Sequence, residues 1–327
     1  MNHKESYILN LFFGEIINEP ISFSHKFTEL KDIHGNDALI TFELFNSDWH
    51  FPIEQEFANF NSIANKQNVG HNFQACAETG IVRIIYPDFK SEHSYIYTEQ
   101  VNMFLQSFIA YLLTFFQRRR VILGCPKLTS GELTILAMPP FLAGELIDSI
   151  GYGSPSIAYE RTKVCLNNAL KTYSESEEND QKHIEMLLTR YNETLNLPYT
   201  YERVESYWRI LEALGHTSEV SDEILNEYNR IKNLLGMRNN SKTLKKFITT
   251  LFNYGIVYTD DNVINSFNYR NLLTHEYLNQ HTISKEYLSE IFRFLNQSIE
   301  FVLLKKLGIN RSEHNSENYT LIQNRIL

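Results

Sequence analysis

The sequence predicts an α+β protein in which a β-rich N-terminal domain, residues 1–175, is followed by an all-α helical bundle, residues 176–327. Three observations support this prediction. The first hundred residues carry short runs of β-branched and aromatic residues between turn formers, which is typical of strands. The second half carries apolar residues at helical spacing. An acidic, polar run at 174–180 separates the two patterns and is suited to a domain boundary.

The N-terminal pattern predicts a mostly β domain with one buried helix. Turn chemistry at His34-Gly35-Asn36-Asp37 and Tyr86-Pro87-Asp88 separates runs that are typical of strands. Residues 99–117 are apolar on most helical faces, so this helix is expected to be buried. Glycine and proline become frequent between about 124 and 160, which predicts loops and short elements. The strand-like runs are 7–9, 21–23, 38–45 and 81–86.

Apolar residues recur every three or four positions in the C-terminal half, as they do along the buried face of a helix. The stripes run from Ile184 to Leu195, Val204 to Leu214, Ile224 to Leu235, Leu244 to Phe252 and Leu288 to Leu303. A glycine stands where several of these segments should end, as glycine does at helix C-termini. These glycines are Gly215, Gly236, Gly255 and Gly308. This half is therefore predicted to be an all-α bundle.

Length and charge limit the class of protein. The chain has 327 residues, enough for two domains with cores of their own. Hydrophobic residues make up 43%, which excludes a disordered chain. The formal net charge is -9, which excludes a uniformly basic coat for nucleic acid but leaves room for a local basic face.

Motifs for cofactors, metals and membranes are missing from the sequence. The three cysteines, Cys76, Cys125 and Cys165, are widely spaced, and the histidines of the first domain show no metal-ligand spacing, so we expect no metal and no cofactor. The longest apolar run, 103–116, is shorter than the roughly 20 residues that span a bilayer. The N-terminus has no signal-peptide pattern, and we expect a cytoplasmic protein without a membrane partner.

The segment most informative about chemistry is NYRNLLTHEY at 268–277, on a predicted helix. Asn271 and His275 are four residues apart and share a helical face, so the Asn amide can hold the imidazole in one orientation. Arg270 projects from the adjacent stripe and supplies a permanent cation for a phosphate, beside a histidine that titrates near neutral pH. The alternative is structural: Arg270 pairs with a glutamate, and His275 caps the helix or packs.

This segment resembles the motif of HEPN domains, in which an Arg is followed by a polar residue and, after four to six residues, by a His. Upstream, RYNETLNLP at 190–198 and YWRILEAL at 207–214 resemble the helices that open the Apea-like branch of that family. The resemblance covers about residues 183–307. The first half of the chain is expected to correspond to the β-rich domain found ahead of HEPN domains in Apea-type phage-defence proteins. The resemblance assigns no functional residue in this half.

The resemblance implies a metal-independent endoribonuclease that acts as a homodimer, often as the toxic effector of an antiphage or toxin–antitoxin system. Cleavage of RNA through its own 2′-hydroxyl needs a base at that hydroxyl, an acid at the leaving 5′-oxygen and positive charge on the phosphate. A two-fold dimer that apposes the motif helices would supply two His and two Arg. In this hypothesis His275 is the acid/base or orients the 2′-hydroxyl, Arg270 stabilises the phosphate, and Asn271 fixes His275 or touches the phosphate.

A local basic stretch and two tyrosines are candidates for RNA contacts. Six cations and no acid lie between positions 230 and 246: Arg230, Lys232, Arg238, Lys242, Lys245 and Lys246. We expect RNA phosphates at the last four of these, with a solvated helix face as the alternative. Tyr269 and Tyr277 flank the motif and could stack on unpaired bases, with packing in the core or at an interface as the alternative.

Two other functions are left open by the sequence. A non-catalytic HEPN-like module would bind RNA or a nucleotide, or dimerise, without cleavage. A partner-regulated scaffold would bind a protein or a phage-derived trigger through the N-terminal domain. Catalytic residues should line an open cleft at a two-fold interface, whereas structural ones should be buried and bonded within their own chain. A large exposed apolar patch on the first domain would favour the scaffold.

Overall fold

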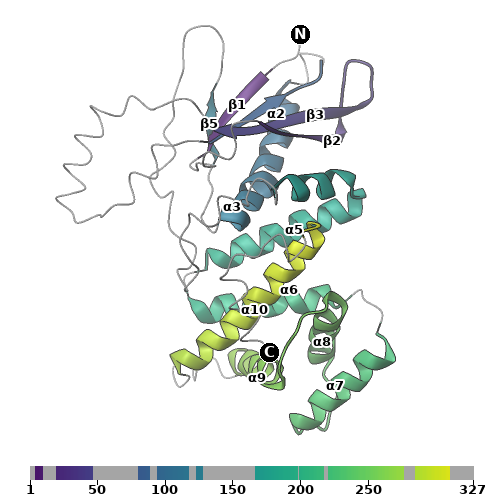
Figure 1. Cartoon of the computed structure of the whole chain (residues 1–327), viewed down its shortest axis with the longest axis vertical. Helices are drawn as coiled ribbons and strands as arrows, with labels where there is room; N and C mark the ends of the chain where they lie inside the picture. Colours follow the sequence, from purple (N-terminus) through teal and green to yellow (C-terminus); the bar gives the residue numbers. More distant parts are fainter. Residues whose placement is uncertain are drawn as a thin grey trace, which may run out of the picture. The chain divides into compact units, whose positions relative to one another are not determined.

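The computed structural model describes residues 4–9, 20–46, 80–88, 94–117, 123–127, 166–197, 199–216, 220–275 and 284–309 (Figure 1). The protein is α+β, as the sequence predicts. The chain divides into two compact units, Met1–Gln181 and Lys182–Leu327.

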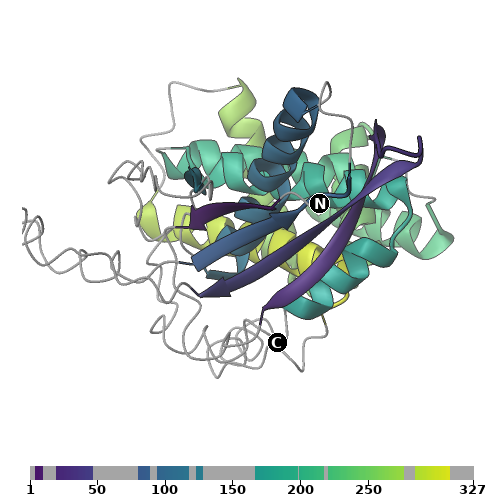
Figure 2. The ribbon, with the colours of Figure 1, turned by 90° about the horizontal axis from the view of Figure 1, so that it is seen from above.

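The described part of the first unit contains an antiparallel sheet of five strands, in the order β2-β3-β4-β1-β5 (Figure 2). β2 and β3 form a hairpin in which Phe23 lies opposite Phe42, and the centroids of their stacked rings are 5.1 Å apart. Asp32 Oδ1 closes the hairpin turn by accepting the backbone N–H groups of His34 and Asn36 at 2.8 and 2.9 Å. The strands are β1 Lys4–Leu9, β2 Ile21–Lys31, β3 Asp37–Asn46, β4 Gly80–Ile85 and β5 Leu123–Lys127.

One continuous helical segment packs against this sheet. It consists of α2 (Ser94–Phe104), the π-helical turn η3 (Leu105–Ala110) and α3 (Tyr111–Gln117). The ring of Phe104 contacts Phe42 of β3 at 5.2 Å, and the ring of Phe108 stacks at 3.9 Å on Tyr173 from a further helix over residues 166–175. This segment ends at Gln117, as does the helix expected over 99–117, and begins five residues earlier, at Ser94.

β2 is longer than the sequence predicts, and β5 is a short element in a region where short elements are expected. β2 extends from the predicted 21–23 to Lys31, because Phe27 and Leu30 continue its buried face through a polar stretch. β5 lies in a region where glycine and proline predicted loops and short elements, and its Pro126 is tolerated because β5 is an edge strand. Residues 128–160 of that region lie outside the described residues.

The described part of the second unit is helical, and α6 contacts α5, α8, α9 and α10. Trp208 on α6 is fully buried and stacks on Phe247 of α8, with ring centroids 3.8 Å apart. Its ring also meets Phe267 of α9 at 6.0 Å. The helices are α5 Glu178–Leu195, α6 Thr200–Leu214, α7 Asp222–Leu234, α8 Lys242–Tyr254, α9 Asp260–His275 and α10 Lys285–Lys306.

The core of the second unit also holds a polar cluster. The Glu300 carboxylate on α10 is buried, and its Oε1 accepts hydrogen bonds from Tyr191 Oη and Asn296 Nδ2, both at 2.9 Å. The bond from Tyr191 joins α5 to α10, and the bond from Asn296 lies within α10. A buried carboxylate is tolerated in an apolar core only where hydrogen bonds replace its contacts with water, so this cluster fixes one register between the two helices.

Candidate functional site

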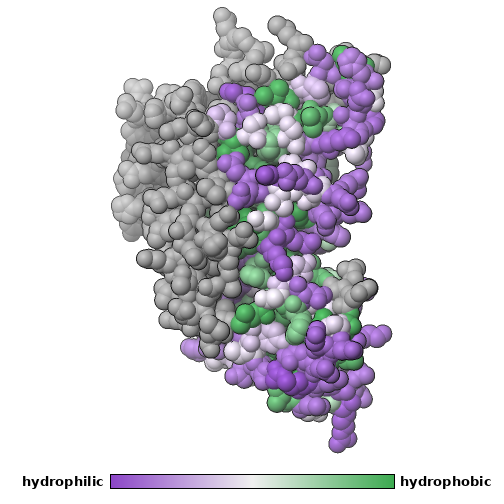
Figure 3. Space-filling view, turned by 45° about the vertical axis from the view of Figure 1, so that its right-hand side comes forward, coloured by the Kyte–Doolittle hydropathy of each residue, from purple (hydrophilic) through white to green (hydrophobic). Residues whose placement is uncertain are grey.

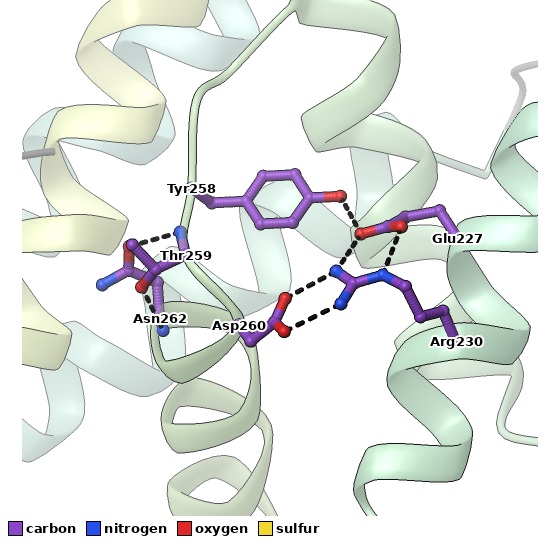
Figure 4. Close-up of polar contacts among 6 residues, drawn as sticks. All are labelled: Glu227, Arg230, Tyr258, Thr259, Asp260 and Asn262. Carbon is purple, nitrogen blue, oxygen red and sulfur yellow. Dashed lines mark hydrogen bonds and ion pairs between the residues drawn. The ribbon is translucent and has the colours of Figure 1, made fainter. Parts of the chain in front are cut away.

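The helix that carries the Arg-Asn-His motif, α9, begins with a reciprocal cap (Figure 4). Thr259 Oγ1 accepts the backbone N–H of Asn262 at 3.2 Å, and Asn262 Oδ1 accepts the backbone N–H of Thr259 at 3.0 Å. Asp260 and Asp261 add negative charge to the first turn, which is favourable at the positive end of the helix dipole. The start of α9 is therefore fixed by local sequence.

A charged cluster ties this end of α9 to α7 (Figure 4). The Arg230 guanidinium donates to both carboxylate oxygens of Asp260, at 2.8 and 2.5 Å, and to both of Glu227, at 2.8 Å each. Tyr258 Oη donates to Glu227 Oε1 at 2.8 Å. Two bidentate pairs on one guanidinium define its orientation, so the cluster fixes α9 against α7.

The same cluster changes the acid–base properties of its members. Hydrogen bonds from Arg230 lower the pKa values of Glu227 and Asp260 below their ordinary range. The two carboxylates in turn raise the pKa of Arg230. Burial, and then the bond to Glu227, raises the pKa of Tyr258. All four groups therefore keep one protonation state through the neutral range.

The body of α9 is packed on two adjoining stripes. Val263 and Phe267 lie on one, and Ser266, Tyr269 and Leu273 on the other, and all five are buried. Asn271 follows Val263 and Phe267 at four-residue spacing and comes three residues after the exposed Asn268, and its own side chain is half-buried. Asn271 therefore lies at the edge of the buried face of α9.

Arg270 and Asn271 are brought together at the C-terminal part of α9. Both side chains are half-buried, and Arg270 Nη1 donates to Asn271 Oδ1 at 3.1 Å. The carbonyl oxygen of the Asn271 side chain thus accepts a hydrogen bond from Arg270. The N–H groups of the same side-chain amide can donate hydrogen bonds to a phosphate or to an imidazole nitrogen. A cation and an amide donor are in this way presented from neighbouring positions of one helix.

His275 is the last residue of α9, one helical turn beyond Asn271. Its side chain lies outside the described residues, and so does Tyr277. Tyr269 is only 2% exposed, and burial raises its pKa to about 12. Burial favours the packing alternative for Tyr269, because a ring enclosed by its own chain offers no face for stacking on a base.

The basic stretch separates into paired and unpaired cations. Arg230 has no acid within the stretch, but folding brings Asp260 to it, and Glu227 lies one turn before it on α7. Lys232 Nζ donates to Asn240 Oδ1 at 2.7 Å. Arg238, Lys242, Lys245 and Lys246 form no side-chain hydrogen bond or ion pair with any residue in the described ranges, and the first two are exposed.

Sequence reasoning missed the cluster around Arg230. The spacing of Glu227 and Arg230 on one helix and the Thr259-Asn262 cap were readable signals, since both are local patterns. The pairing of Arg230 with Asp260 spans 30 residues and follows only from the packing of α7 on α9. Tyr258 has no signal in the sequence.

Within the described residues, no three His, Cys, Asp or Glu side chains are placed to hold a metal ion. None of the helices described is long and apolar enough to cross a membrane. Comparison with protein-family models, with curated proteins and with solved structures finds no match.

Proposed function

We propose that this protein is a metal-independent endoribonuclease that acts as a homodimer, with Arg270, Asn271 and His275 as its catalytic residues. The observation that carries the proposal is the pairing of Arg270 with Asn271 on α9, one turn before His275. It supports the proposal because a permanent cation and an amide donor stand one helical turn before a histidine in the same helix. The resemblance of this segment to the HEPN motif gives the proposal its reaction.

The proposed roles of Arg270 and His275 follow from the chemistry of their side chains. Arg270 balances the charge that develops on the phosphate as the RNA 2′-oxygen forms a bond to phosphorus and the bond to the 5′-oxygen breaks. His275 takes the proton of the 2′-hydroxyl or supplies one to the 5′-oxygen. A second copy of the chain would bring a second imidazole for the other proton transfer, which is why a homodimer belongs to the proposal.

The test is RNA cleavage in the presence of EDTA by the full-length protein and its variants. We expect the wild-type protein to cleave the RNA. The Arg270→Ala and His275→Ala variants should not cleave it, although both should still fold and dimerise. Arg209→Ala and His216→Ala are matched controls, because both side chains are exposed in the same unit and should leave the rate unchanged. Cleavage that survives in Arg270→Ala and His275→Ala, or that EDTA eliminates, contradicts the proposal.

We also propose that cleavage serves as the toxic effector step of an antiphage or toxin–antitoxin system. Induced expression in a bacterial host should then arrest growth, and His275→Ala should relieve the arrest at equal protein level. Arrest by both forms, or by neither, contradicts a toxicity that depends on cleavage.

One observation favours a second candidate, a non-catalytic HEPN-like module that binds RNA or a nucleotide. Arg270 is half-buried and hydrogen-bonded within its own chain, as a structural arginine would be. Such a module would bind RNA but leave it intact under every condition in which wild type is folded. The cleavage assay above separates the two candidates.

A further inference from the structure

Four cations in and before the first turns of α8 make a basic surface. We call Arg238, Lys242, Lys245 and Lys246 the α8 basic surface. Arg238 and Lys242 are exposed, and Lys245 and Lys246 are half-buried. None of the four is paired within the described chain, in contrast to Arg230, which two carboxylates hold. No acidic side chain in the described ranges therefore pairs with the charge of this surface.

Its composition is unfavourable for the stability of α8 alone. The first turn of α8 has no acidic residue, although α7 and α9 carry two each in theirs. Lys242, Lys245 and Lys246 are three or four positions apart or adjacent, so their like charges repel one another and the positive end of the helix dipole. A multivalent anion bound across these side chains would remove both penalties.

The surface is held on a fixed frame. The loop before α8 is fastened where Tyr228 Oη accepts the backbone N–H of Ser241 at 2.8 Å and where Lys232 holds Asn240. Ser241 Oγ caps α8 by accepting the backbone N–H of Leu244 at 3.2 Å. Cations on a preorganised frame lose less entropy on binding than cations on a free loop.

The surface is also linked to α9. Phe247 directly follows Lys246 and stacks on Trp208, and Trp208 contacts Phe267, which lies one turn before the Arg270–Asn271 pair. In Figure 3 the coloured residues of one face of the molecule are mostly hydrophilic, with hydrophobic residues singly or in small groups.

We propose that the α8 basic surface docks the phosphate backbone of single-stranded RNA, apart from the residues that cleave it. The charge complementarity between four cations that pair with no described acid and a polyanion supports this ligand. The inference rests on the proposed function, because that function selects RNA among polyanions. The surface supplies affinity, whereas Arg270 and His275 supply the chemistry.

The test is binding of a fluorescently labelled single-stranded RNA of mixed sequence to the full-length protein, in the His275→Ala background so that the probe stays intact. The test variant changes all four surface cations to Gln: Arg238→Gln, Lys242→Gln, Lys245→Gln and Lys246→Gln. The control variant removes the same charge from exposed positions elsewhere: Lys171→Gln, Arg190→Gln, Arg209→Gln and Lys285→Gln. Thermal melting checks that both variants are folded.

We expect the test variant to bind RNA about tenfold or more weakly. The slope of log binding constant against log salt concentration should be shallower by about 3, since each phosphate contact with a single strand contributes roughly 0.7 to this slope. The control variant should bind within about twofold of its parent, because general attraction to net charge is weak at physiological salt. Restoring positive charge with Arg at all four positions should restore binding. Equal losses in both variants, or no loss in the test variant, overturns the inference.

Two further arms make the outcomes distinguishable. Duplex DNA of the same length should compete poorly, and equal competition overturns the assignment to RNA. If RNA binds through this surface but wild type never cleaves it, the proposed function fails and the docking site stands. The four substitutions are also made in the protein that keeps His275, and its KM for RNA is compared with that of wild type. If cleavage depends on Arg270 and His275 but this KM is unchanged, the docking site fails and the proposed function stands.

Discussion

Arg230 on α7 and Asp260 at the start of α9 lie 30 residues apart in the chain and are joined by two hydrogen bonds, at 2.8 and 2.5 Å. The same guanidinium holds Glu227, so one side chain connects two helices through two carboxylates. This contact fixes the first turn of the helix that carries the proposed catalytic residues at its other end.

Replacing Asp260 with Asn should lower the free energy of unfolding by about 1 kcal/mol at pH 7, because the pair is partly exposed and screened by water. Arg230 lowers the pKa of Asp260 in the folded state, so the contribution is present above the unfolded pKa of about 4 and is lost as pH falls through the folded value. Urea denaturation at pH 7 and pH 2.5 measures both effects.

The control for this prediction is Asp261→Asn. Asp261 stands next to Asp260 in the first turn of α9 and is exposed, so its replacement removes the same charge from the same end of the helix dipole. It should cost only a few tenths of a kcal/mol. Equal losses in the two variants would assign the effect to the dipole rather than to Arg230.

Stability should fall in acid because of His25. Burial lowers its pKa to about 4, and its ring stacks on Phe104 with centroids 4.3 Å apart. The unfolded chain, with a pKa of about 6.5, binds the proton first, so the stabilisation is present above pH 6.5 and is lost between about pH 6.5 and 4. The loss can reach about 3 kcal/mol if the whole shift acts on folding.

His25→Phe keeps an aromatic ring and removes the titration. Chemical denaturation of this variant between pH 7 and pH 4 should show a smaller loss of stability than wild type. His34→Asn is the control, since it removes a histidine from an exposed position in the β2–β3 turn. If His25→Phe and wild type lose stability in parallel, His25 is not the titrating group.

Gly215 is required where α6 ends against α8. A Cβ at this position would lie 2.0 Å from the carbonyl oxygen of Lys246 and 2.8 Å from Thr250 Oγ1. Gly215→Ala should therefore cost about 1–3 kcal/mol by overpacking and shift the first turns of α8. Gly236→Ala meets no atom within 4 Å but has a φ of +63, so it should cost only about 1 kcal/mol. Denaturation curves that rank Gly236→Ala as the more damaging change would contradict the packing argument.

Local patterns predicted the helices of the second unit well, because each amphipathic stripe is a property of its own segment. Gly236 and Gly255 follow α7 and α8 with φ of 63 and 68, the left-handed conformation that glycine adopts without strain. The helix over 166–175 and strand β5 were not predicted as such. Their existence depends on partners in the rest of the unit, such as Phe108 for Tyr173 and β1 for β5.

The candidate site was predictable only where it is local. Helical spacing placed Arg270 and Asn271 at neighbouring positions of one helix, and the structure adds that they bond to each other. The burial of Tyr269 and the pairing of Arg230 with Asp260 depend on which helices pack together, so neither is encoded within a single segment. Sequence patterns predict which residues share a face of a helix. Tertiary contacts determine which of those side chains are buried and which form ion pairs.

The Arg270–Asn271 bond leads to a prediction about cleavage. Asn271→Asp keeps the oxygen that accepts from Arg270 and adds a negative charge, so the bond becomes a stronger, charge-assisted ion pair. The guanidinium is then held by the protein and partly neutralised, which makes it a poorer partner for a phosphate. We expect unfolding stability to stay equal or rise while kcat for RNA in EDTA falls by about tenfold or more.

Asn268→Asp is the matched control, because it introduces the same charge one turn earlier on the same helix, at an exposed position. Repulsion of RNA by added negative charge would affect both variants and appear mainly in KM, whereas capture of Arg270 would lower kcat in Asn271→Asp alone. Equal kinetics for the two variants would mean that Asn271 does not control Arg270 during cleavage. A loss of stability in Asn271→Asp would mean that the bond is held by its surroundings in a way that a carboxylate disrupts.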